Sequence, residues 1–247
     1  KRINEFLKIQ PDIQNEHQEK SIIDGSIAFN NVSFVYDDTN IRALDNLSFS
    51  IKKGETLAIL GKTGSGKSSI LSLISRLYDA TEGEILIDGK PIKQVNLYDL
   101  RNSIGIVPQD AFLFSDSIKN NIKFGKETAT DEEVEEAAKK AVILDNIMQF
   151  NQGYETVLGE RGITISGGQK QRVSIARAMI KDAPILLLDD CLSAVDTETE
   201  EAILNNLLPF CKDKTTVIVS HRVSSAKNAD QIIILEQGKI IQQGSHN

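Results

Sequence analysis

The sequence lacks the features that define several protein classes. It has no tryptophan and only two cysteines, Cys191 and Cys211, which cannot build a disulfide framework and do not form the C-x-x-C spacing of a zinc site. Its apolar runs reach four residues, as in Ile185–Leu188 and Ile232–Leu235, whereas a membrane-spanning helix needs about 20. These absences exclude a disulfide scaffold and a cysteine-based zinc site, and they favour a reducing, cytosolic setting.

Positive charge is also scarce. Lys and Arg number 28 against 35 Asp and Glu, so the formal net charge is −7, and no block rich in Lys or Arg is present. This balance argues against binding to a nucleic-acid backbone, and any anion that binds must be held by local geometry. The 247 residues, 40% hydrophobic and 26% charged, have a globular composition and suffice for one α/β domain or two small ones.

The first part of the chain changes from polar to alternating. Residues 1–24 are mostly polar and predict the end of a helix followed by a linker. Alternating apolar side chains then predict antiparallel strands over residues 27–36 and 47–51.

Short apolar segments further along predict a parallel sheet. Thr56–Leu60 is an apolar strand that leads directly into a glycine-rich loop, and apolar residues at helical spacing follow over Ser68–Leu77. Further strands are expected over residues 185–190, 215–221, 231–235 and 239–243, the last two joined by a turn at Gln237-Gly238. Strand, loop, helix and later apolar strands together indicate an α/β fold.

A helix-rich section, residues 110–180, is expected as an insertion between the strands of this sheet. Thr130 and Glu133 have the spacing of a helix-capping box, and acidic residues follow in the first turn. The apolar stripe of this helix is expected to run from Val134 to Val142.

The glycine-rich loop fits the phosphate-binding pattern G-x-x-x-x-G-K-[ST]. Its residues are Gly61, Lys62, Thr63, Gly64, Ser65, Gly66, Lys67 and Ser68. Glycines let backbone N–H groups turn towards phosphate oxygens, and the positive end of the following helix points at the same place. Because the Lys67 ammonium can reach outer phosphates and the Ser68 hydroxyl can ligate Mg²⁺, the loop predicts a phosphate site with a metal ion.

Three polar side chains follow apolar strands. Asp189 closes the strand ILLL and fits the carboxylate that a Mg²⁺ site needs at the end of a neighbouring strand. His221 closes the strand TTVIVS, where a γ-phosphate contact is favoured over a purely structural role. Gln109, which follows Pro108, is by spacing alone a loop glutamine.

Ser166-Gly167-Gly168-Gln169 lies between the phosphate loop and the segment ILLLDD, and it resembles the signature of the ATP-binding cassette (ABC) ATPases. The resemblance covers the chain from about Ile27 to Gly244 with the motifs in the family's order. It implies a P-loop NTPase (RecA-like) core with an antiparallel β subdomain and an inserted helical subdomain. The ATPase domain would cover residues 25–247, with the helices at about 110–180, and would bind ATP and Mg²⁺.

The resemblance also implies roles for individual residues. By position, Gly61–Ser69 resemble the Walker A loop, Asp189 the Walker B aspartate, Gln109 the Q-loop glutamine, Ser193-Ala194-Val195-Asp196 the D-loop, and His221 the H-loop histidine. Ser68, Gln109 and Asp189 would then hold Mg²⁺, while Asp190, His221 and Gln109 would act in catalysis. Tyr36 matches the aromatic residue that stacks on adenine, and Phe34, on the same strand face, is the competing candidate.

In this family two domains pair head to tail, and the signature of one covers ATP held by the other. The resemblance therefore implies a second ABC ATPase domain as partner, with ATP driving dimerisation. Gly159-Glu160-Arg161-Gly162 is similar to an exporter loop that contacts membrane helices, and residues 1–24 resemble the tail that joins the two domains. We therefore expect the soluble half of an exporter, separated from its transmembrane domain, at the cytoplasmic face of the membrane.

One residue departs from the family pattern. The family has Glu after the Walker B aspartate, where it positions or activates the attacking water, and this chain has Asp190. Asp is shorter by one methylene, and a misplacement of about 1 Å can cost on the order of a hundredfold in rate. Such a substitution is typical of the degenerate-site subunit of bacterial heterodimeric multidrug exporters, which favours a heterodimer; a homodimer that hydrolyses slowly is the alternative.

Two functions from different classes follow. The first is an ATPase that drives export, and the second is a nucleotide-gated dimerisation module with little hydrolysis of its own. A soluble ABC ATPase acting on DNA or ribosomes, and an importer subunit, share the same motifs. The net charge of −7 and the exporter-like segments argue against the DNA- or ribosome-acting class.

Overall fold

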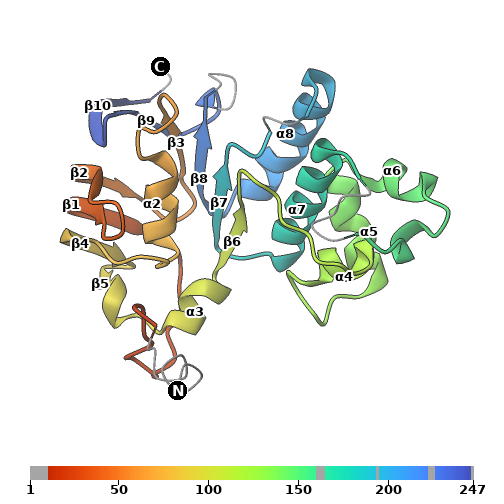
Figure 1. Ribbon diagram of the computed structural model, residues 1–247, viewed down its shortest axis with the longest axis horizontal. Helices are drawn as coiled ribbons and strands as arrows, with labels where there is room; N and C mark the ends of the chain where they lie inside the picture. Colours follow the sequence, from red (N-terminus) through yellow and green to blue (C-terminus); the bar gives the residue numbers. More distant parts are fainter. Residues whose placement is uncertain (1–10, 160–164, 193–194, 222–225, 246–247) are drawn as a thin grey trace.

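The computed structural model describes residues 11–159, 165–192, 195–221 and 226–245. Two sheets lie side by side with helices around them (Figure 1). The four-stranded sheet is antiparallel and has the order β2-β1-β4-β5. Its strands are β1 (Ile27–Tyr36), β2 (Ile41–Ile51), β4 (Glu82–Ile87) and β5 (Lys90–Pro91).

The six-stranded sheet has the order β10-β9-β3-β8-β7-β6. All its pairings are parallel except the β9–β10 hairpin. Its strands are β3 (Thr56–Leu60), β6 (Ile104–Val107), β7 (Ile185–Asp189), β8 (Thr215–Ser220), β9 (Gln231–Glu236) and β10 (Lys239–Gly244). The predicted α/β fold with a largely parallel sheet is confirmed, and the carboxyl ends of β3, β6, β7 and β8 meet at one edge.

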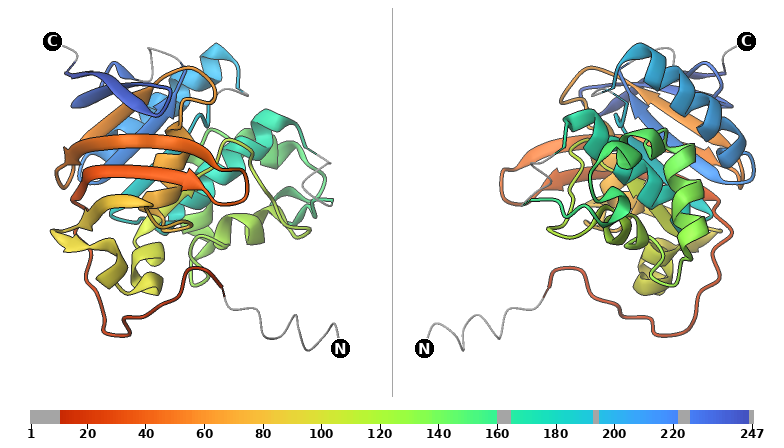
Figure 2. Two further views of the ribbon diagram at one scale, coloured as in Figure 1. Left: turned by 60° about the vertical axis from the view of Figure 1, so that its left-hand side comes forward. Right: turned by 90° about the vertical axis from the view of Figure 1, so that its right-hand side faces the viewer.

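The helices fall into two groups. The helix α2 (Lys67–Ile74) packs between the two sheets, and the short α3 (Leu97–Asn102) precedes β6. The others are α4 (Ile118–Lys123), α5 (Asp131–Lys140), α6 (Leu144–Gln149), α7 (Gly167–Lys181) and α8 (Thr197–Cys211), with 3₁₀ turns η1 (Ile92–Gln94) and η2 (Gly153–Glu155). Figure 2 shows α4 to α7 on the side of the molecule away from the four-stranded sheet.

Two helices end earlier than their apolar patterns predict. After α2, Arg76 adopts a left-handed φ of 49°, and the Leu77 N–H donates to the Ser72 carbonyl at 2.8 Å. After α5, Val142 has a φ of 56°, and the Ile143 N–H donates in the same 6→1 pattern. Both are Schellman motifs without the usual glycine, so the sequence carries no visible stop signal. Leu77 is consequently 53% exposed, and its predicted place in the apolar stripe is wrong.

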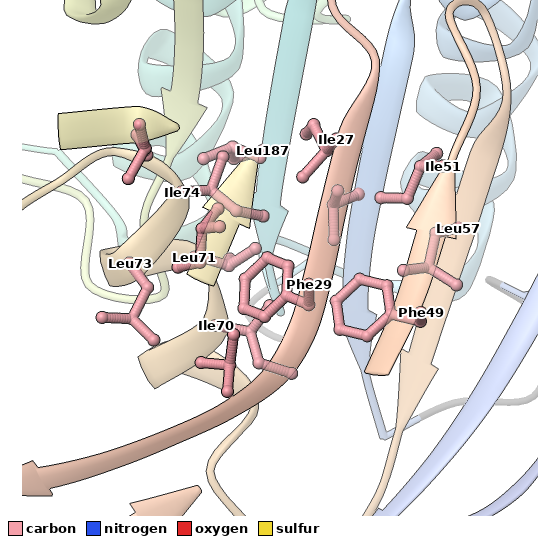
Figure 3. Packing of buried hydrophobic residues seen from close by; sticks show 14 of the residues in the cluster. Ile27, Phe29, Phe49, Ile51, Leu57, Ile70, Leu71, Leu73, Ile74 and Leu187 are labelled. Atoms are coloured by element: carbon pink, nitrogen blue, oxygen red, sulfur yellow. The ribbon is translucent and has the colours of Figure 1, made fainter. Parts of the chain in front are cut away.

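The six-stranded sheet is covered on both faces. Along β7, Ile185 and Leu187 belong to the core shared with α2 and the four-stranded sheet, whereas Leu186 and Leu188 belong to the core under the helices. This division follows from the two-residue period of a strand. Phe29 and Phe49 stack at the centre of the first core with ring centroids 4.5 Å apart (Figure 3).

Removing one of these rings should destabilise the whole domain. Phe29 is 1% exposed, so Phe29→Ala leaves a cavity and is expected to cost about 3–5 kcal/mol of unfolding free energy. Phe124→Ala is the matched control because Phe124 is 59% exposed, and it should cost less than about 1 kcal/mol. Denaturant unfolding of both variants checks this; equal costs would contradict the assignment of Phe29 to the core.

Candidate functional site

A cleft of about 360 Å³ opens at the carboxyl edge of the six-stranded sheet. It is lined by parts of the phosphate loop, by residues that follow β6, β7 and β8, and by parts of β1, β2 and the β9–β10 turn. These residues are Tyr36, Ile41, Arg42, Ala43, Thr63, Gly64, Gly66, Lys67, Ser68, Ser69, Gln109, Asp189, Asp190, Val219, His221, Gln237 and Gly238.

The loop around Lys67 is held by its own contacts. Lys67 is the first residue of α2, and its Nζ donates to the carbonyl oxygens of Gly61 and Lys62, both at 2.8 Å. Burial lowers the pKa of Lys67, while the nearby Asp190 and Asp189 raise it. Gly66 has a φ of 99°, and a Cβ there would lie 2.3 Å from the Ala43 carbonyl oxygen, so this position requires glycine.

Asp189 is held in a partly buried position at the end of β7. Burial raises its pKa, and a hydrogen bond from the Ser68 side chain acts in the opposite direction. Its Oδ1 is buried and has no hydrogen-bond partner among the residues that the structure describes. A buried carboxylate oxygen without a donor beside a serine hydroxyl is an oxygen pair that suits Mg²⁺, which commonly takes few protein ligands and completes its shell with phosphates and water.

The other strand-end residues reach the same cleft. Asp190 follows directly on Asp189 with a left-handed φ of 43°, and its N–H donates to the Val219 carbonyl at 2.8 Å. Gln109 and His221 are exposed residues that line the cleft from beyond β6 and β8. The fold thus brings together the residues predicted from three separate strands.

The structure distinguishes the two aromatic candidates on β1. Phe34 is 3% exposed and belongs to the core, whereas Tyr36 is half-buried and lines the cleft. The Tyr36 hydroxyl lies 3.0 Å from the Ser69 Oγ at the start of α2. Tyr36 is therefore the aromatic that is available to a ligand in this cleft.

The signature lies apart from the residues that line the cleft. Ser166 caps α7 in a capping box with Gln169, and Gly167 and Gly168 form the first turn. Asp196 likewise caps α8, accepting from the Thr199 N–H at 2.9 Å. Of the other predicted segments, Glu160–Gly162 and Ser193-Ala194 lie outside the described residues.

Part of the cleft was not predicted from the sequence. Ile41, Arg42 and Ala43 come from β2, and Gln237 and Gly238 were identified only as a turn. The Gly238 N–H donates to the Ser65 carbonyl at 3.0 Å, which fixes this turn against the phosphate loop. Because the two segments are far apart in sequence, only the fold reveals the contact.

Comparison with known proteins identifies the family. The profile described as "ABC transporter" matches residues 44–193. The chain belongs to the ABC transporter family. A structure of a bacterial Atm1-family ABC exporter with ATP bound is similar to this chain with a TM-score of 0.94 and 42% identity, over 99% of this chain and 43% of that one. This likeness confirms the ABC ATPase fold, and the chain is a nucleotide-binding domain of the ABC type.

Curated relatives carry similar names. A putative multidrug export ATP-binding/permease protein of Staphylococcus aureus is 50% identical over 93% of this chain and 40% of its own length. The uncharacterized ABC transporter ATP-binding protein YfiB of Bacillus subtilis is 47% identical over the whole chain and 43% of its own length. The chain thus spans about two fifths of these relatives. Among the described residues of this ABC domain, no helix has the length and apolarity to cross a membrane.

Proposed function

We propose that this ABC domain powers export through an attached transmembrane domain by hydrolysing ATP with Mg²⁺ in the cleft. The observation that carries the proposal is the convergence of the phosphate loop, Asp189, Asp190, Gln109 and His221 on one cleft. A phosphate cradle, a carboxylate for a divalent cation and polar groups for the attacking water are the parts that phosphoryl transfer requires.

The loop binds the phosphates and Tyr36 stacks on the base. The Lys67 ammonium donates to two backbone carbonyls, and phosphate oxygens, which carry charge, compete with these for the same protons. The remaining loop residues between Gly61 and Ser69 contribute N–H groups and hydroxyls around the phosphates.

Ser68, Gln109 and Asp189 are the proposed Mg²⁺ ligands. The Asp189 Oδ1, which is buried and has no hydrogen-bond partner in the described part of the chain, supports this assignment. When bound, Mg²⁺ neutralises charge on the phosphates. Asp190 orients the water that attacks the γ-phosphate, and His221 donates a hydrogen bond to that phosphate.

A second ABC ATPase domain completes the site. Ser166 lies outside the cleft of its own chain, at an exposed helix N-terminus whose N–H groups favour a phosphate. We propose that it covers the ATP of the partner, in a heterodimer or, as the alternative, a homodimer. Asp196 contacts the nucleotide from the same side. In this proposal the assembly works at the cytoplasmic face of the membrane, and we expect no binding to nucleic acid.

A bulky cation at the signature should separate binding from turnover. In the full-length protein, Ser166→Arg is expected to lower ATP turnover by at least about tenfold, because it obstructs the partner's γ-phosphate, and to leave ATP affinity within about twofold. Thr130→Arg is the matched control, since Thr130 caps α5 in a capping box of the same type. Phosphate release and equilibrium ATP binding check both variants. Equal turnover in the two would contradict the pairing.

A further inference from the structure

In Figure 1 the short helix α3 lies at the end of α2 opposite to the phosphate loop, and it contacts the two helices whose first turns carry the proposed phosphate-binding residues. These are α2, which begins in the phosphate loop, and α7, which begins at the signature. Both contacts are made at the carboxyl ends of the longer helices. A rigid-body movement of either helix would therefore also move its contact with α3.

The contact with α2 is made by Arg101. Its Nη2 donates to the Arg76 carbonyl at 2.9 Å and its Nε to the Ser75 carbonyl at 3.5 Å. Ser75 and Arg76 are the residues at which α2 ends in its Schellman turn. Arg101 thus binds carbonyl oxygens that the end of a helix leaves without an intrahelical donor.

The contact with α7 is made by Lys181, the last residue of that helix. Its Nζ donates to the carbonyls of Arg101 and Ile104, both at 2.8 Å, at the junction of α3 and β6. Burial lowers the pKa of Lys181, as expected for an ammonium held away from water. Ten residues earlier, the buried Gln171 donates to the Pro108 carbonyl at 3.0 Å, so α7 is tied to both ends of β6.

The same junction leads directly to the proposed catalytic groups. β6 runs from α3 to Pro108 and Gln109, which lines the cleft. The residue that ends α3, Ser103, accepts from the Ile185 N–H at 3.1 Å, where β7 starts on its way to Asp189. Four parts of the two ATP sites therefore meet at one six-residue helix: the loop helix, the signature helix and the strands that carry Gln109 and Asp189.

We propose that α3 couples the two composite ATP sites, and that Arg101 and Lys181 are positioning residues for hydrolysis. The inference rests on the proposed function, because the signature of this chain serves the partner's site and the loop serves its own. With both contacts in place, Gln109, the loop and the signature move together. Without the two contacts, the loop and the signature still bind phosphate, but the loop, the signature and Gln109 no longer reach the positions needed for hydrolysis at the same time.

The segment before β1 is seated on the same helix. The Asn15 Oδ1 accepts from the Leu97 N–H at 2.9 Å, and the Ser21 Oγ accepts from the Asn96 N–H at 3.1 Å. The Asp99 carboxylate in turn accepts from the Ser21 N–H at 2.7 Å. The chain that precedes the domain, which we predict to be a linker, is therefore joined to α3 by three hydrogen bonds.

The test replaces Lys181 by Met, which keeps the apolar stem and removes the donor. In the full-length protein, kcat is expected to fall about tenfold while KM and ATP affinity change less than about twofold, and Lys181→Arg should restore most of the rate. Arg101→Met should have the same effect. Lys214→Met is the matched control, because Lys214 is also partly buried and pairs with Asp182.

Hydrogen exchange provides the second readout. Addition of the ATP analogue AMP-PNP with Mg²⁺ is expected to slow exchange at residues 97–102 by at least about threefold in the unchanged protein and in Lys181→Arg, and not in Lys181→Met. Slower exchange of these amides in Lys181→Met as well, or an unchanged kcat, would overturn the inference. The inference would also be overturned if the loss of kcat in Lys181→Met were fully explained by a smaller fraction of folded protein. If the unchanged protein released no phosphate, the proposed function itself would fail.

Discussion

Asp190→Glu is expected to raise ATP turnover of the full-length protein by up to about a hundredfold. Asp190 and Glu carry the same charge, but Glu reaches further by one methylene, and placement of the attacking water depends on that reach. The backbone around the residue is fixed by the N–H bond to Val219 and by a left-handed φ of 43°. The main chain therefore cannot easily advance to compensate for the shorter side chain.

Two further variants separate reach from charge. Asp190→Gln has the length of Glu without the carboxylate, and Asp190→Asn has the present length without it. Both should be nearly inactive, since neither amide can accept a proton or orient water as a carboxylate does. Steady-state phosphate release with saturating MgATP measures all four proteins. Turnover that is unchanged by Glu would show that Asp190 suffices, and it would contradict the expectation that Asp190 makes this a degenerate, slowly hydrolysing site.

This result also decides between the two functional classes. The expected increase with Glu would mean that this cleft hydrolyses ATP slowly in its present form and that the faster site is the partner's. Hydrolysis that appears only after the change to Glu would mean that the domain works as a nucleotide-gated pairing module. A small change means that the domain is itself an efficient ATPase and supports a homodimer. The intact signature at Ser166 is consistent with either arrangement.

Lys67→Ala is expected to abolish ATP hydrolysis and to weaken ATP binding by at least about tenfold. Lys67 is 6% exposed, and a charge-assisted hydrogen bond from its ammonium to phosphate is worth about 1.5–3 kcal/mol. Its removal also takes the donor from the Gly61 and Lys62 carbonyls, which loosens the loop. Equilibrium binding of ATP measures the first effect and phosphate release the second.

The control removes an equal charge beside the cleft. Lys239 follows Gly238, is mostly exposed and pairs with Asp45 at 3.1 Å. Lys239→Ala should therefore leave affinity and turnover within about twofold, because exposed ion pairs contribute little. If both lysine variants bound and hydrolysed ATP alike, the loop would not be the phosphate site.

The sequence predicted the strands of the six-stranded sheet better than it predicted helix ends or the four-stranded sheet. There β2 (Ile41–Ile51) extends beyond the predicted residues 47–51, and β4 (Glu82–Ile87) was not predicted. The strand Thr56–Leu60 was predicted with the bounds that the structure has, because a short apolar run between polar turns leaves few alternatives. The ends of α2 and α5 were not, because Arg76 and Val142 adopt conformations that usually require glycine. Such a stop depends on packing around the end of the helix, and residue type does not reveal it.

Some residues of the candidate site could likewise be predicted from the sequence and others could not. The loop and Asp189 have a recognisable spacing, because phosphate binding and strand ends constrain neighbouring residues. Gln237 and Gly238 reach the cleft only because β9 pairs with β3, which no local pattern encodes. Lys181 is a similar case. In the sequence it is an ordinary lysine at the end of a helix, and only the structure shows that its Nζ donates to two carbonyls.

The most direct test of the account is the rate of phosphate release by the full-length protein as a function of ATP concentration, with Mg²⁺ and with EDTA, for the unchanged chain and Lys67→Ala. The account predicts a slow, saturable rate that requires Mg²⁺ and disappears in Lys67→Ala. No release from the unchanged chain, or release that Lys67→Ala leaves intact, would contradict the assignment of the cleft as an ATP-hydrolysing site.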